Sequence, residues 1–211
     1  MKKYLAEFVG TFTLVFCGTG AVVVNELRDG VVSHVGIAIT FGLVVMAMIY
    51  TFGEKSGAHL NPAVTLAFAA HKVFPKQQVL PYIFSQLTGA LAASLVLKLL
   101  FPTSEFLGAT LPSGSALQSW IMEIFLTLFL MLTILSVSEG GKERGLFAGL
   151  AVGSVVLLEA MFAGPVSGAS MNPARSLGPA LASGHLREIW IYLTAPVAGS
   201  LLAVIVHRLM K

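Results

Sequence analysis

Charged residues are scarce in this chain. They make up only 11% of its 211 residues, whereas a typical soluble domain carries about 25%. Apolar residues reach 56%, and the mean hydropathy is +0.86. A soluble protein of this composition could not cover its own surface with polar side chains, so lipid must surround most of the chain.

Cysteine and clustered basic residues are also lacking. Cys17 is the single cysteine, so an internal disulfide is excluded. The net charge is +3, but the basic residues lie singly or in pairs, with no stripe interleaved with aromatic residues, so no nucleic-acid partner is expected. No group of His, Cys and Glu has the spacing of metal ligands, and we expect neither a metal nor a cofactor.

Long apolar runs, in contrast, are abundant. Six of them can cross a hydrocarbon core of about 30 Å, which requires roughly 20 helical residues. Because backbone groups in lipid must be satisfied within their own segment, each run is predicted to be a helix. The predicted helices cover approximately residues 4–24, 31–52, 79–101, 117–137, 146–164 and 189–209. The polar connections between them are predicted at residues 25–30, 101–115, 138–145 and 183–188.

The first run contains Glu7 and is longer than the apolar core of a signal peptide, so we interpret it as a retained membrane helix. Glu7-x-x-x-Thr11 in this run returns as Glu123-x-x-x-Thr127 in the fourth. The chain is therefore predicted to be one all-α membrane domain over residues 1–211, with repeats at about 1–105 and 116–211. Each repeat holds three membrane helices, and because three is odd, the second copy is inverted in the membrane.

A second pair of segments strengthens the repeat. Ser56-Gly-Ala-His-Leu-Asn-Pro-Ala-Val-Thr65 returns, 111 residues later, as Ser167-Gly-Ala-Ser-Met-Asn-Pro-Ala-Arg-Ser176. Asn is a favoured helix N-cap and Pro a favoured first helical residue, so each copy is predicted to begin a helix of roughly 10 residues, half a membrane long. The pore motif consists of Asn61, Pro62, Ala63, Asn172, Pro173 and Ala174.

The paired motifs predict a pore near the bilayer midplane. Each Asn oxygen should cap its own half-helix, which leaves the amide NH₂ to donate into the lumen. Each helix N-terminus adds about half a positive charge, which opposes cations. Non-helical backbone at this depth is tolerated beside a wet cavity. The carbonyls expected to line it belong to Gly57, Ala58, His59, Gly168, Ala169 and Ser170.

Several buried polar residues have more than one interpretation. Arg175, one turn into the second half-helix, is predicted to place a fixed cation at the outer mouth. Glu7 and Glu123 are candidates for function within a membrane, but we interpret them as structural carboxylates that accept hydrogen bonds from the re-entrant loops. Glu159 fits a vestibule wall, a subunit contact or a protonated buried group. Ser170 and His59 could be imagined as a hydrolase pair, yet nothing supplies the activating geometry, so no catalytic residue is predicted.

Basic residues predict the orientation. With the N-terminus inside, nine basic residues lie on the cytoplasmic side: Lys2, Lys3, Lys55, Lys72, Lys76, Lys142, Arg144, Arg208 and Lys211. Only Arg28 and Arg187 lie outside. We therefore expect a multi-pass protein of the cell membrane, the inner one where there are two, with both termini cytoplasmic.

These motifs and the inverted repeat resemble the aquaporin, or major intrinsic protein, family over essentially the whole chain. The resemblance implies six helices plus two re-entrant half-helices, a pore in each subunit and a homotetramer. The family's filter positions fall on Phe41, Ala160, Ala169 and Arg175. The segment from Phe162 to Met171 resembles the nodulin-like intrinsic branch and its bacterial relatives.

That resemblance implies a passive channel for water and small uncharged solutes that excludes ions and protons. The expected solutes are glycerol-like polyols and boric, arsenous or silicic acid, because Ala160 stands where water-selective members carry His. Ser176 and Ala180, in contrast, match the residues of water channels. A strictly water-selective aquaporin is therefore the alternative, and a secondary transporter with broken helices is a more distant one.

Overall fold

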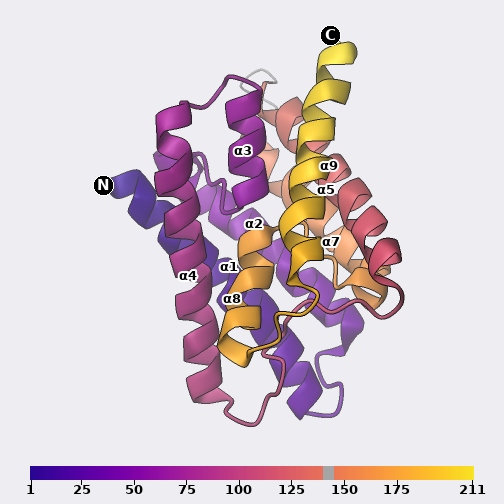
Figure 1. Ribbon diagram of the computed structural model, residues 1–211. Helices are drawn as coiled ribbons and strands as arrows, with labels where there is room; N and C mark the ends of the chain where they lie inside the picture. The colour runs from indigo at the N-terminus through magenta and orange to yellow at the C-terminus, as the bar shows by residue number, and fades with distance from the viewer. Residues whose placement is uncertain (140–144) are drawn as a thin grey trace.

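The chain is built from helices arranged around two short ones that meet in the middle (Figure 1). The computed structural model describes residues 1–139 and 145–211. The long helices are α1 (Lys2–Leu27), α2 (Ser33–Ser56), α4 (Val79–Leu100), α5 (Ala116–Ser138), α7 (Ala148–Ser167) and α9 (Ile189–Leu209). The short elements are α3 (Pro62–Ala70), the 3₁₀ turn η1 (Lys76–Gln78) and α8 (Pro173–Ser183).

The six predicted spans are confirmed as helices long and apolar enough to cross a membrane. Their ends differ from the expected ones by up to four residues, as α2 continues to Ser56 and α7 to Ser167, each reaching the loop of its motif. The connection predicted at residues 138–145 falls largely on residues outside the described ranges, as do Lys142 and Arg144.

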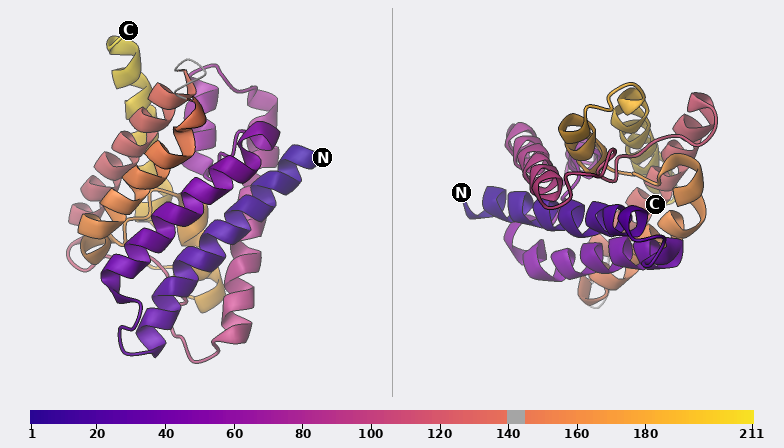
Figure 2. Two further views of the ribbon diagram at one scale, coloured as in Figure 1. Left: turned by 180° about the vertical axis from the view of Figure 1, so that it is seen from behind. Right: turned by 90° about the horizontal axis from the view of Figure 1, so that it is seen from below.

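The two repeats pack in matching ways. In the first, α1 packs against α2 and α4; in the second, α5 packs against α7 and α9. The halves then join, because α2 lies against α7, α8 against α4, and α3 against α9 (Figure 2). The same contacts made twice indicate an internal two-fold relation between the repeats.

Glycines mark where the backbones come closest. A Cβ on Gly42 would lie 2.7 Å from the Gly153 carbonyl oxygen, and one on Gly153 would lie 2.6 Å from that of Gly42. These residues are 111 positions apart, the same offset as the two motifs, so equivalent positions of the two halves contact each other. Gly89 and Gly199 allow α4 and α9 to approach α1 and α5 in the same way.

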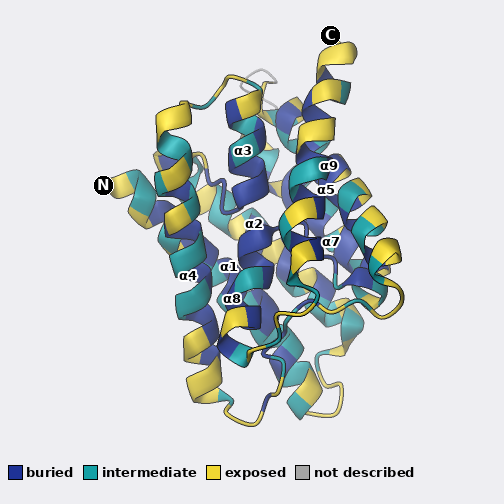
Figure 3. Cartoon of the chain, in the orientation of Figure 1, coloured by how far each residue is buried: buried dark blue, intermediate teal, exposed yellow. Residues whose placement is uncertain are grey.

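The distribution of polar and apolar side chains is the reverse of that in a soluble protein. Large apolar side chains such as Leu80, Phe84 and Leu99 are more than two-thirds exposed on the outside of α4. Ionisable side chains within the spans, including Glu7 and Glu123, are fully buried. Figure 3 shows exposed residues along the outer faces of the helices and buried residues where they meet. The apolar outside suits lipid, and the interior holds the polar groups.

Candidate functional site

The two half-helices begin at the predicted residues. The Asn61 side chain accepts a hydrogen bond from the Ala63 N–H at 2.9 Å, and Pro62 is the first helical residue. The Asn172 side chain accepts from the N–H groups of Ala174 and Arg175 at 3.0 and 3.4 Å. The prediction that each Asn caps a half-helix is therefore confirmed.

The loop before each Asn has the same unusual backbone. Gly57, which ends α2, has φ of 85°, and Gly168, which ends α7, has φ of 84°. Two non-glycine residues in each loop also have positive φ: Ala58 and Leu60 in the first, Ala169 and Met171 in the second. Such conformations are costly for residues with a Cβ and persist only where their surroundings enforce them.

Glu7 holds the first loop in this conformation through hydrogen bonds. Its Oε1 accepts from the Ser56 hydroxyl at 2.7 Å and the His59 N–H at 2.9 Å. Its Oε2 accepts from the Leu60 N–H at 2.7 Å and from the Gln86 amide at 2.8 Å. The carboxylate therefore satisfies backbone groups that the irregular loop cannot pair within itself.

Glu123 does the same in the second half. Its Oε1 accepts from the Ser167 hydroxyl at 2.7 Å and the Ser170 N–H at 2.8 Å, and its Oε2 accepts from the Met171 N–H at 2.8 Å. The contacts of both carboxylates agree with the structural interpretation.

The motifs contact each other across the two-fold axis. The Asn61 amide donates to the Met171 carbonyl, and the Asn172 amide donates to the Leu60 carbonyl, each at 2.8 Å. An amide NH₂ has two donors. The sequence predicts that both N–H groups of each Asn amide are free to donate into the lumen. In the structure one N–H of each amide donates to the opposite loop instead, and the second N–H remains available.

Two cavities adjoin the motifs. We call one the inner cavity: it passes the paired Asn residues and extends to Ser138 and Ala148, at the end of the bundle where Lys211 contacts Glu139. The outer one is lined by residues that include His34, Gly108 and Pro165. Four residues line both cavities and so mark the boundary between them: Phe41, Ala160, Ala169 and Arg175.

Arg175 is held in place without being fully engaged. Its Nη1 donates to the Gly108 carbonyl at 3.0 Å, and its guanidinium carbon lies 5.0 Å from the centre of the Phe41 ring. The side chain is buried, and its Nε has no hydrogen-bond partner among the described residues. An oriented guanidinium with unused N–H groups at this boundary can donate to the oxygen of a passing molecule.

The predicted carbonyl residues divide between the cavities. Gly57, Ala58, His59 and Ser170 line the inner cavity, whereas Gly168 lines the outer one. Ala169 lies at the boundary. The irregular loops therefore border cavities, which is where non-helical backbone is tolerated at membrane depth.

His59 and Ser170 serve separate local networks. The His59 Nδ1 pairs with the Thr65 hydroxyl at 3.1 Å, and the ring packs against Phe68. The Ser170 hydroxyl pairs with that of Ser176 at 2.5 Å. Within the described ranges, the structure has no His59–Ser170 hydrogen bond of the kind a hydrolase pair needs.

Sequence reasoning missed several supporting residues. The hydroxyls of Tyr82 and Tyr192 donate to the Ser56 and Ser167 carbonyls at 2.9 and 2.7 Å. Their separation of 110 residues, close to that of the motifs, could have identified them.

Glu159 is buried, and neither of its carboxylate oxygens has a partner among the described residues.

Comparison with known proteins places this arrangement in a family. The model of the major intrinsic protein family matches residues 1–207. Aquaporin NIP1-1 of Oryza sativa subsp. japonica is 46% identical over 212 residues, which cover 100% of this chain and 75% of that protein. Nodulin-26 of Glycine max is 46% identical over 213 residues, covering 100% of this chain and 78% of its own length.

A solved structure agrees with the fold. The X-ray structure of the aquaglyceroporin from Plasmodium falciparum superimposes with a TM-score of 0.89 at 28% sequence identity, covering 97% of this chain and 93% of that one. The expected fold class and the resemblance to nodulin-like relatives are thus confirmed. The chain belongs to the major intrinsic protein family, and it is a multi-pass membrane channel for water and small solutes rather than an enzyme.

Proposed function

We propose that this channel conducts water together with small uncharged solutes, such as glycerol-like polyols and boric, arsenous or silicic acid, and excludes ions and protons. The main support is the constriction at which the two cavities meet. It combines one fixed cation, Arg175, with an aromatic ring, Phe41, and two methyl side chains, Ala160 and Ala169. Together the four side chains offer hydrogen-bond donors on the Arg175 side of the path and an apolar wall on the other sides.

Charge exclusion follows from the same geometry. Arg175 and the N-termini of α3 and α8 all present positive charge toward the path. No carboxylate is among the described residues that line either cavity. A cation would meet this field without a compensating anion, a mechanism for which aquaporin-type pores are the established example. We assign the pore role to Asn61 and Asn172 and the filter role to the four constriction residues.

The breadth of selectivity depends on Ala160. A methyl group at this position leaves space and removes a polar side chain from the constriction, which favours a solute larger than water with an apolar face. Ser176, whose identity matches water-selective channels, is fully buried and lines neither cavity. The side chains at the constriction contact the solute directly, so we give them greater weight than Ser176.

Stopped-flow light scattering of proteoliposomes tests this proposal. Vesicles with the channel should shrink faster than empty vesicles in an osmotic step and should then reswell faster in glycerol or boric acid. Urea serves as a neutral solute of different shape. Faster water flux with no entry of glycerol or boric acid would establish the strictly water-selective alternative, and flux that collapses with an ion gradient would indicate a transporter.

We further propose a homotetramer in the cell membrane with both chain ends cytoplasmic. The family resemblance supports the tetramer, and the excess of basic residues on one side supports the orientation. Light scattering of the purified protein in detergent would measure the subunit number. Single cysteines introduced at residue 2 or 28 after Cys17→Ser replacement should be labelled from outside intact cells only at residue 28.

A further inference from the structure

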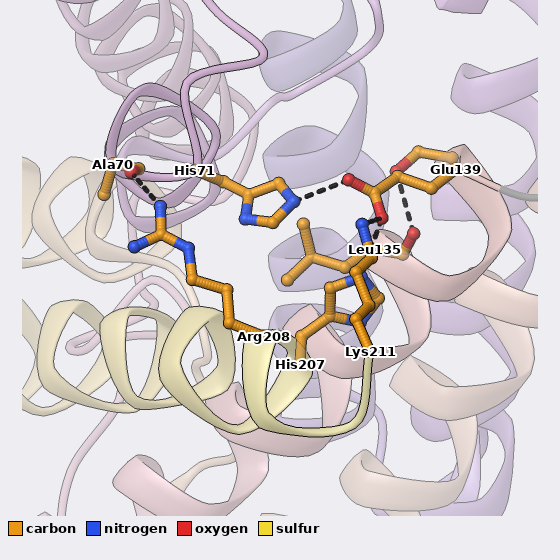
Figure 4. Close-up of polar contacts among 8 residues, drawn as sticks. Ala70, His71, Leu135, Glu139, His207, Arg208 and Lys211 are labelled. Atoms are coloured by element: carbon orange, nitrogen blue, oxygen red, sulfur yellow. Dashed lines mark hydrogen bonds and ion pairs between the residues drawn. The ribbon is translucent and has the colours of Figure 1, made fainter.

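Three helix ends meet on the side of the bundle that carries both chain termini. His71 ends α3, Glu139 ends α5, and His207 lies in the last turn of α9. Figure 4 shows the two imidazole rings turned toward the same carboxylate. Each histidine is 68 residues from Glu139 in sequence, so this cluster is produced entirely by the fold.

The three side chains present their metal-binding atoms to one another. The His71 Nε2 lies 2.5 Å from Glu139 Oε1, and the His207 Nε2 lies 2.8 Å from Glu139 Oε2. The ring centres are 5.5 Å apart at an angle of 76°. One ligand atom from each residue lies within 4.8 Å of the other two. The histidine side chains are 7% and 9% exposed and that of Glu139 is 25% exposed, so a solvent path reaches the carboxylate.

We propose that His71, Glu139 and His207 form a binding site for a first-row divalent cation, with Zn²⁺ the best fit. Two imidazole nitrogens and a carboxylate are a typical donor set for zinc with a water in the fourth position. Zinc bonds of about 2.1 Å hold tetrahedral ligands about 3.4 Å apart. The two histidine–carboxylate contacts must therefore open by less than about 1 Å, and any wider separation must close by at most about 1.4 Å. Binding uses the lone pair of each Nε2, so each neutral imidazole must carry its proton on Nδ1 when the ion is bound.

Lys211 competes with the cation for this site. Its ammonium contacts Glu139 Oε2, and its side chain is 55% exposed beyond the end of α9. The Glu139 carboxylate is thus contacted by Lys211 as well as by His71 and His207. Arg208 does not contact the carboxylate in the described structure but donates to the Ala70 carbonyl at 2.7 Å.

The position of the site gives binding a structural consequence. Val137 and Ser138, which directly precede Glu139, line the inner cavity. An ion at this site would tie the ends of α3, α5 and α9 together beside the mouth of that cavity. It would therefore stabilise the folded channel through preferential binding to the native state.

Metal titration of the purified, tag-free channel tests the proposal. Calorimetry should detect one Zn²⁺ per subunit, and Co²⁺ should give the visible absorption of a nitrogen- and oxygen-coordinated ion. Mg²⁺, which prefers oxygen ligands, should not compete. His71→Ala, His207→Ala and Glu139→Gln should each weaken binding by at least about tenfold, the lower end of the cost of losing even an outer partner of a metal ligand.

Two variants make the test specific. His185→Ala, which removes a histidine that pairs with Glu105 at 3.8 Å elsewhere, should leave Zn²⁺ affinity unchanged. Lys211→Ala should tighten binding by up to about fivefold, the scale of an exposed ion pair. A purely structural ion network predicts no such gain. The helical circular dichroism and water flux of each variant report whether it has folded.

Either of two results would overturn the proposal. One is the absence of saturable Zn²⁺ binding to the folded wild-type channel. The other is binding that persists unchanged when both histidines are replaced by alanine. Because these measurements do not involve solute flux, their outcome is independent of the proposed selectivity.

Discussion

The two halves of the channel share a scaffold and differ in the side chains they place at the two mouths. In each half a buried carboxylate, a serine hydroxyl and a tyrosine hydroxyl hold the loop before a half-helix. The first loop then presents His59 within a set of aromatic rings, whereas the equivalent residue of the second is Ser170. Val64 in the first half-helix corresponds to Arg175 in the second. The two halves therefore share the side chains that support the loops and differ in the side chains that face the path.

The largest expected effect is loss of a loop's carboxylate. Glu7→Ala would leave four donors without their acceptor and Glu123→Ala three, and each unsatisfied buried donor costs about 1–3 kcal/mol. Both variants should fail to give monodisperse protein in detergent, with Glu7→Ala at least as severe. Glu54→Ala, on the exposed face of α2, is the matched control. A stable Glu123→Ala channel would show that the second loop does not depend on its carboxylate.

Close backbone packing should be the next most sensitive feature. A Cβ on Gly199 would lie 2.2 Å from the Ile124 carbonyl oxygen, and one on Gly89 would lie 2.4 Å from that of Phe8. Because backbone cannot move aside easily, each Gly→Ala variant should lose about 1–3 kcal/mol of stability, seen as a lower melting temperature. The same change at Gly53, which has no neighbouring atom within 4 Å of the added carbon, should not destabilise the protein. Equal melting temperatures for all three would contradict the close approach.

Selectivity should respond differently to equivalent changes in the two halves. Ala160→His adds a ring at the boundary between the cavities and should reduce glycerol and boric acid flux by about tenfold or more while water flux persists. Ile49, its counterpart 111 residues earlier, lines only the inner cavity. Ile49→His should therefore reduce solute flux less in the same stopped-flow assay. Unchanged solute uptake in Ala160→His would show that the filter is placed wrongly.

The smallest expected effect should be equal in the two halves. Tyr82→Phe and Tyr192→Phe each remove one hydroxyl that donates to a serine carbonyl, at 2.9 and 2.7 Å. Each should cost about 0.5–1.5 kcal/mol, the usual net value of one hydrogen bond. Thermal unfolding should give similar losses for the two variants. A clear difference would show that the loops, despite their matching geometry, are supported unequally.

Much of this architecture could be predicted because its signals are local. The Asn–Pro pair carries its own capping chemistry, so both half-helices begin where the sequence indicates, and a hydrophobic run reports a span directly. The four proposed filter positions followed from the family resemblance, and in the structure all four line the boundary between the two cavities.

Contacts between the halves could not be derived in this way. The hydrogen bonds from each Asn to the opposite loop depend on how the repeats dock, which no periodicity encodes. We also expected no metal site, because the spacing of His71, Glu139 and His207 has no resemblance to a ligand motif. Only the meeting of three helix ends places these residues together.

Because Asn61 and Asn172 each donate a hydrogen bond to the opposite loop, neither half is self-sufficient. Each repeat supplies hydrogen-bond partners to the other's loop. One repeat expressed alone would therefore have an Asn amide without its acceptor and a carbonyl without its donor. Damage to either motif must therefore disturb both re-entrant segments at once. The narrow middle of the channel is in this sense a joint product of the two repeats, whereas its entrances are free to change one at a time.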